Sequence, residues 1–84
     1  MTNDQIASAI GTPTSKSDVF EIRFKARNPI KGMFIETSDY RELSRKNLWR
    51  IVHENNLEEY TRSQNEALAR IFNGNEFTKL RRLS

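Results

Sequence analysis

The chain has 84 residues, which suits one domain with one modest core, and 14 Lys and Arg against 11 Asp and Glu give it a net charge of +3. The absence of cysteine excludes disulfide frameworks, thiolate zinc sites and thiol nucleophiles. The longest apolar runs are triplets, far below the roughly 20 residues of a membrane helix, and the N-terminal residues do not resemble a signal peptide. We therefore expect a folded cytoplasmic protein without a membrane segment.

The first ten residues predict a short helix, because Thr2 and Gln5 have the spacing of a capping box. The residues that follow are rich in turn formers and poor in apolar groups, which indicates a flexible connector. We therefore predict a flexible N-terminal segment over 1–17, with the short helix inside it, and one domain over 18–84.

Apolar and charged side chains alternate most clearly over 19–27, and this pattern predicts a half-buried strand. Asn28 and Pro29 end that strand, because proline has no amide hydrogen to donate and restricts the residue before it. A second, shorter strand is expected over 33–36. The two strands together predict an antiparallel β-hairpin.

Two helices are expected after the hairpin. The first is predicted over 39–54, with Asp39 as a suitable N-cap, and the second over 57–72, where an apolar stripe runs along one side. A short C-terminal helix is expected next, with Phe77 and Leu80 on one side.

The element order β-β-α-α predicts a small single α+β domain in which two helices and a short C-terminal helix pack on a two-stranded antiparallel sheet. A hairpin by itself is only marginally stable. It must therefore pack on the helices or pair with the hairpin of a second copy, which would give a dimer with a four-stranded sheet.

Trp49 is the only tryptophan, and on the expected helix it does not share the apolar stripe of Leu48 and Ile51. One interpretation makes it a core residue between two packed elements, since an indole packs well while its N–H finds a polar partner. The other makes it a surface anchor for a partner, with Val52 and Arg45 beside it. The sequence leaves both interpretations open.

Two functions agree with this pattern, and neither is catalytic. The first is a small adaptor or regulatory domain that works through contacts of Trp49, Val52 and Arg45 with another protein or with a second copy in a homodimer. The second is a nucleic-acid-binding module in which Trp49 or Tyr40 stacks on a base and basic residues contact phosphates. The basic residues are Arg23, Lys25, Arg27, Arg41, Arg45, Lys46 and Arg50. Because the basic excess is small, the first hypothesis is preferred.

No pattern for catalysis or metal binding stands out. His53 is the only histidine, and one histidine does not make a histidine-based zinc site. No nucleophile motif, phosphate-cradling glycine loop or calcium loop is present in the sequence. We therefore expect no enzyme activity, no catalytic residue, no cofactor and no metal.

Overall fold

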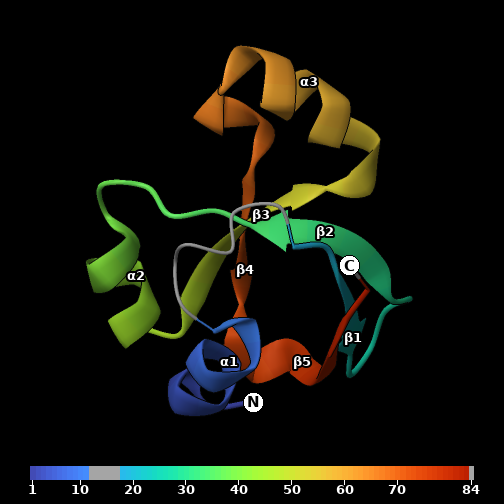
Figure 1. Ribbon diagram of the computed structural model, residues 1–84. Coiled ribbons are helices and arrows are strands. Elements are labelled where there is room, and N and C mark those ends of the chain that lie inside the picture. Colours follow the sequence, from blue (N-terminus) through green and yellow to red (C-terminus); the bar gives the residue numbers. More distant parts are fainter. Residues whose placement is uncertain (12–17, 84) are drawn as a thin grey trace.

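The computed structural model describes residues 1–11 and 18–83, which fold into a small α+β domain around a five-stranded antiparallel sheet (Figure 1). The strands are β1 (Phe20–Phe24), β2 (Ile30–Phe34), β3 (Leu48–His53), β4 (Arg70–Asn73) and β5 (Phe77–Arg82). The helices are α1 (Asn3–Ile10), α2 (Tyr40–Arg45) and α3 (Leu57–Ser63), with single 3₁₀ turns η1 (Glu54–Asn56), η2 (Glu66–Leu68) and η3 (Gly74–Glu76). The connector predicted after Gly11 falls on 12–17 and lies outside the described residues.

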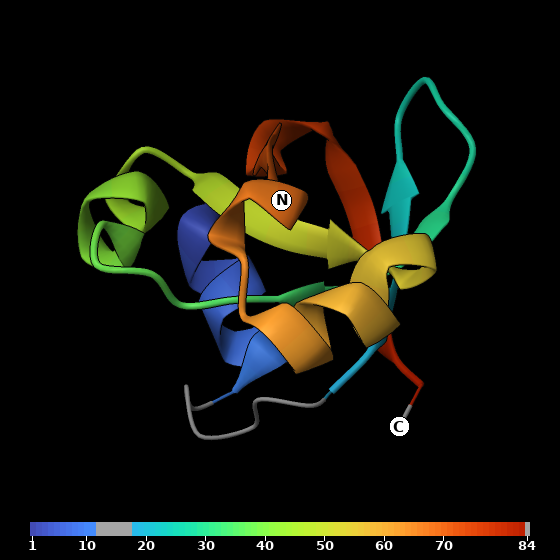
Figure 2. The same cartoon turned by 90° about the horizontal axis from the view of Figure 1, so that it is seen from above.

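The strand order is β4-β3-β2-β1-β5, so the predicted hairpin forms the middle of a larger sheet. Two strands separate β4 from β1, yet the ring centroids of Phe24 on β1 and Phe72 on β4 are only 5.8 Å apart. The sheet is therefore strongly curled, and its concave side encloses the core. Figure 2 shows the same strands from above, with α2 and the hairpin at opposite sides of the molecule.

The main core lies inside the curled sheet and is rich in aromatic residues. Its buried members are Ile6, Phe20, Ile22, Trp49, Ile51 and Phe77. Ile6 comes from α1, whose capping box is formed as expected: Thr2 accepts a hydrogen bond from the Gln5 N–H, and the Gln5 side chain accepts one from the Thr2 N–H. The predicted boundary between an N-terminal segment over 1–17 and a domain over 18–84 stays a prediction. Ile6 of that segment belongs to the same core as the strands.

A second, smaller cluster lies on the opposite side of the central strands. It contains Met33, Ile35 and Val52, and Leu57 and Tyr60 of α3 pack against it. Strand β3 therefore meets apolar residues on both faces, with Trp49 and Ile51 in the main core and Val52 in the second cluster, which explains why four of its six residues are apolar.

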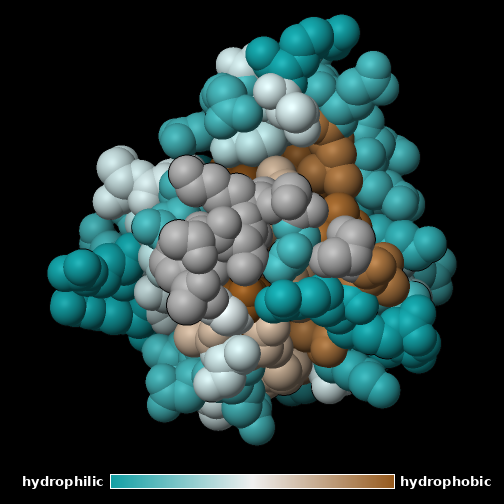
Figure 3. All heavy atoms as spheres, viewed as in Figure 1, coloured by the Kyte–Doolittle hydropathy of each residue, from teal (hydrophilic) through white to brown (hydrophobic). Residues whose placement is uncertain are grey.

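Exposed apolar surface is limited. Ile71 and Leu83 are the large hydrophobic residues that are exposed within the described part of the chain. Figure 3, which shows the side seen in Figure 1, has hydrophilic residues around its outline and hydrophobic residues emerging between them in a band on the right. The described residues contain no helix that is long and apolar enough to cross a membrane.

The helix predicted over 39–54 is wrong beyond its first turns. Helix α2 ends at Arg45, Asn47 takes a left-handed conformation with φ 61°, and β3 begins at Leu48. A residue with positive φ ends a right-handed helix, and asparagine tolerates that conformation better than most residues. The second half of the predicted helix is thus a central strand.

The helix predicted over 57–72 is also too long. Helix α3 ends at Ser63, Gln64 has φ 56°, and the chain continues through η2 into β4. The predicted C-terminal helix is wrong as well, because Phe77–Arg82 forms β5 and pairs with β1.

The hairpin itself is confirmed, although its strands are Phe20–Phe24 and Ile30–Phe34 rather than 19–27 and 33–36. The helices do not cover a two-stranded sheet, because β3 and β5 pair with the two outer edges of the hairpin. The hairpin has no free edge, so a dimer with a four-stranded sheet made from two hairpins is excluded for this fold.

Candidate nucleic-acid interface

Trp49 lies in the core, with 2% of its surface exposed. Its indole Nε1 donates a hydrogen bond of 2.8 Å to Oδ1 of Asn47, which is itself buried. Val52 is fully buried in the second cluster, while Arg45 is exposed on α2. The three residues therefore do not form a common exposed surface in this conformation, and their role in binding a partner stays a prediction.

Tyr40 is half-buried beside Trp49, with 5.9 Å between the ring centroids in an edge-on arrangement. Burial, together with the charge of Glu36, raises the pKa of the Tyr40 phenol. The Tyr40 ring is thus part of the packing at the start of α2, next to the buried ring of Trp49.

The seven predicted basic residues are divided between two sides of the molecule. Arg23, Lys25 and Arg27 lie on β1 and in the loop that follows it, whereas the other four lie on or next to α2. Those four are Arg41, Arg45, Lys46 and Arg50. Figures 1 and 2 both place α2 and β1 at opposite sides, so one continuous patch of seven residues is not formed.

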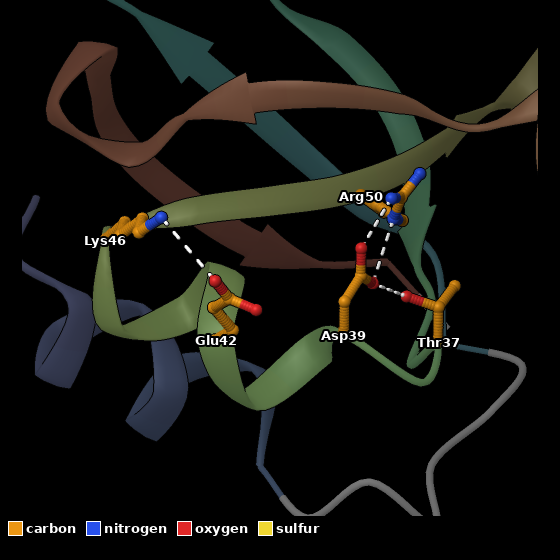
Figure 4. A network of polar contacts seen from close by, with 5 residues as sticks. All are labelled: Thr37, Asp39, Glu42, Lys46 and Arg50. Carbon is orange, nitrogen blue, oxygen red and sulfur yellow. Dashed lines mark hydrogen bonds and ion pairs between the residues drawn. The ribbon is translucent and has the colours of Figure 1, made fainter.

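Two of the cations on the α2 side are paired with acids (Figure 4). Arg50 makes a two-pronged contact with Asp39, with Nη2 to Oδ2 at 2.7 Å and Nε to Oδ1 at 3.3 Å. The hydrogen bond from Arg50, together with one from the Thr37 hydroxyl, lowers the pKa of the Asp39 carboxyl to about 2. Lys46 lies 3.7 Å from Glu42. The Arg50–Asp39 contact attaches the start of α2 to β3, whereas the Lys46–Glu42 pair lies within α2 and its C-cap. Both contacts leave less positive charge for a partner.

The outer face of the three strands β2, β1 and β5 carries a denser group of cations. Glu21 on β1 is opposite Lys31 on β2 and Arg81 on β5, and Arg23 is opposite Lys79 one step along the sheet. Residues directly opposite each other in a sheet project from the same face. The four cations are all exposed, and we call Arg23, Lys31, Lys79 and Arg81 the basic face.

Glu21 organises the basic face. Its side chain is 18% exposed, and its Oε1 lies 3.4 Å from Nε of Arg23 and 4.0 Å from Nε of Arg81. One half-buried carboxylate thus contacts two arginines on neighbouring strands. The four cations and Glu21 together carry a net charge of +3, which equals that of the whole chain, so the remaining charges balance.

Sequence reasoning found Arg23 but missed Lys31, Lys79 and Arg81 as members of this surface. The alternation of Lys79 and Arg81 around the inward-facing Leu80 was the available signal for the last two. No such signal marks Lys31, because the expected hairpin places residue 31 in its loop.

His53 ends β3, and its Nδ1 accepts a hydrogen bond of 3.1 Å from the Asn55 N–H. That contact gives it a local structural role at the start of η1. Within residues 1–11 and 18–83, no group of three or more His, Cys, Asp or Glu residues has a geometry that could hold a metal ion.

No protein-family model, curated protein or solved structure matches this chain.

Proposed function

We propose that this domain binds nucleic acid without catalysis, through the basic face of β2, β1 and β5. The observation that carries the proposal is the concentration of the net charge in four cations on adjacent positions of three hydrogen-bonded strands. Neighbouring strands are roughly 4.8 Å apart, so the cations cover a width of about 10 Å. Lys and Arg side chains held at this density attract the phosphate backbone and release its counterions.

The arrangement of the face supports the same proposal. A sheet holds side chains in fixed register, which reduces the entropy lost when several of them contact one partner. Glu21 further restrains Arg23 and Arg81. Lys31 and Lys79 form no ion pair with any of the described residues, so their charges are available to an anionic partner.

Four phosphate contacts predict that the logarithm of the affinity for a single strand falls with the logarithm of salt concentration with a slope of about −3. The double variant Lys31→Gln, Lys79→Gln is expected to halve this slope and to weaken binding about 25-fold at 0.1 M salt. Both substitutions leave the pairs of Glu21 intact. Fluorescence anisotropy with a labelled oligonucleotide across a salt series measures both quantities.

The matched control is the double variant Arg41→Gln, Arg45→Gln on α2, which removes the same charge from the opposite side of the molecule. It is expected to change the affinity less than 3-fold. Equal losses in the two variants would show that only net charge matters, and absence of binding by the wild-type protein at low salt would remove the proposal.

A second candidate function is the one preferred from the sequence, a domain that acts through contacts with another protein or a second copy. Strand β4 is an edge of the sheet, and Ile71 on it is 48% exposed. An edge strand with an exposed apolar side chain favours strand pairing with another chain. The occupant that we test is a second copy of this domain.

Pairing through β4 predicts a dimer at high micromolar concentration, seen by size-exclusion chromatography with light scattering. Ile71→Lys is expected to return the protein to a monomer, because a charge on an edge strand opposes edge-to-edge pairing. The control Leu83→Lys alters the other exposed apolar residue and should leave the dimer unchanged. A wild-type protein that stays monomeric contradicts this candidate.

A further inference from the structure

A groove lies between the end of β1 and strand β4. Its volume is about 480 Å³, and Phe24, Arg27, Arg70, Phe72, Asn73 and Glu76 are among its lining residues. This volume is within the roughly 300–1,000 Å³ of small-ligand sites. The groove therefore has room for one flat ring system.

The floor of the groove is aromatic. Phe24 and Phe72 are half-buried neighbours, and Phe77 packs edge-on against Phe24 with 5.3 Å between ring centroids. The guanidinium carbon of Arg27 lies 5.0 Å from the centroid of Phe24 and 5.7 Å from that of Phe72. Arg27 thus forms a planar cationic cover over two fixed rings.

Arg27 is exposed and makes no ion pair with the described residues, so it can shift without leaving a carboxylate unpaired. A guanidinium plane and a phenyl ring are both surfaces on which unpaired bases stack. The side-chain amide of Asn73 adds a hydrogen-bonding group at the wall, and exposed Arg70 adds a second positive charge against the one carboxylate of Glu76.

The groove lies at the end of β1, and the basic face lies along the outer side of the same strand, because Arg23 and Phe24 are consecutive residues whose side chains project from opposite faces. Lys25 connects Arg23 of that face to the loop carrying Arg27, and its backbone N–H donates a 2.9 Å hydrogen bond to the carbonyl of Glu76 at the groove wall. A nucleic-acid strand whose phosphates contact the basic face would have to cross the end of β1 to place a base in the groove.

We infer that this groove receives one unpaired base of single-stranded nucleic acid, stacked on Arg27 and the rings of Phe24 and Phe72. The inference rests on the proposed function, and it adds that the substrate is single-stranded, because a base in a duplex is not free to enter the groove.

Two conservative variants test the groove. Arg27→Lys keeps the charge but removes the guanidinium plane, and Phe72→Leu keeps apolar volume but removes the ring. Because stacking on one aromatic residue contributes about 5- to 150-fold in affinity, each variant is expected to weaken binding of a labelled single-stranded oligonucleotide at least 5-fold at 0.1 M salt. The slope of affinity against salt should stay unchanged, because no phosphate contact is lost.

The control variant is Arg45→Lys, the same exchange on α2, which should leave the affinity unchanged. A duplex of the same sequence should bind wild-type protein more weakly than the single strand does and should respond less to Arg27→Lys. If the wild-type protein binds but Arg27→Lys has wild-type affinity, or if the duplex binds more tightly, the groove inference is wrong and the basic face stands. If the wild-type protein binds neither form at low salt, the proposed function fails as well. Circular dichroism checks that each variant folds. If Phe72→Leu does not fold, the affinity of the Arg27→Lys variant decides the test, because Arg27 is exposed.

Discussion

Replacing Trp49 by alanine is expected to lower the free energy of unfolding by about 3–5 kcal/mol, the range for large aromatic side chains removed from a core. Trp49 is 2% exposed and has edge-on contacts with Phe34 and Tyr40 at centroid distances of 6.1 and 5.9 Å. A small domain has a total stability of roughly 5–15 kcal/mol, so this variant loses much of it. Urea unfolding followed by far-UV circular dichroism measures the loss.

The same experiment has two controls. Ile71→Ala removes an apolar side chain that is 48% exposed and should change the stability by less than about 1 kcal/mol. In the wild-type protein, Trp49 emission should be blue-shifted and protected from acrylamide until the protein unfolds. A red-shifted, readily quenched emission from the folded protein would place the indole in water and contradict its position in the core.

The burial of Trp49 shows where sequence reasoning failed. Strand β3 is apolar at Leu48, Trp49, Ile51 and Val52, because one of its faces meets the main core and the other meets the cluster beneath α3. A strand buried on both faces has no polar alternation, and its apolar positions also fit part of a helix. The clear alternation of apolar and charged residues over 19–27 belongs to a strand with one exposed face. The prediction of a strand there is confirmed, although β1 is shorter, at Phe20–Phe24.

The apolar spacing in β5 is typical of a helix because of a bulge. Phe24 pairs with Phe77 whereas Arg23 pairs with Lys79, so Thr78 is an extra residue in the register. The bulge lets Phe77 and Leu80 both face the core although they are three residues apart, a spacing typical of a helix. A bulge depends on tertiary pairing, which no local pattern of residues contains.

The basic face was unpredictable for the same reason. Its four residues come from 23, 31, 79 and 81, and they meet only through the registers of β1 with β2 and with β5. The alternation of charge along β1 predicted that Arg23 is exposed, but the partners on either side required the strand order. The capping box of Thr2 and Gln5 is entirely local, and the sequence was sufficient to predict it.

Substituting Gly74 by alanine is expected to destabilise the domain by about 2–6 kcal/mol, because the added methyl group has no room. A Cβ at this position would lie 2.2 Å from Oδ1 of Asn47 and 2.5 Å from Cδ1 of Ile6. Overpacking of this kind costs about 1–3 kcal/mol. Moving the Asn47 amide also removes the acceptor of the buried Trp49 N–H, and an unsatisfied buried donor adds about 1–3 kcal/mol. Urea unfolding by circular dichroism measures the change.

A double-mutant cycle with Asn47→Gly separates the clash from a general effect of alanine in η3. Glycine suits position 47, where φ is 61°. Without the Asn47 side chain, Gly74→Ala should cost less than in the wild-type protein, by a coupling of about 0.5–3 kcal/mol. Additive losses would mean that the Asn47 side chain moves without cost and that the contact with Ile6 dominates.

A coupled result instead makes Asn47 the residue that holds the end of α2, the indole of Trp49 and the turn into β5 together. Its backbone carbonyl also accepts a 2.7 Å hydrogen bond from the Gly74 N–H. That turn leads directly into β5, the strand that carries Lys79 and Arg81. If Gly74→Ala loosens the pairing of β5 with β1, it should therefore also weaken nucleic-acid binding at the basic face.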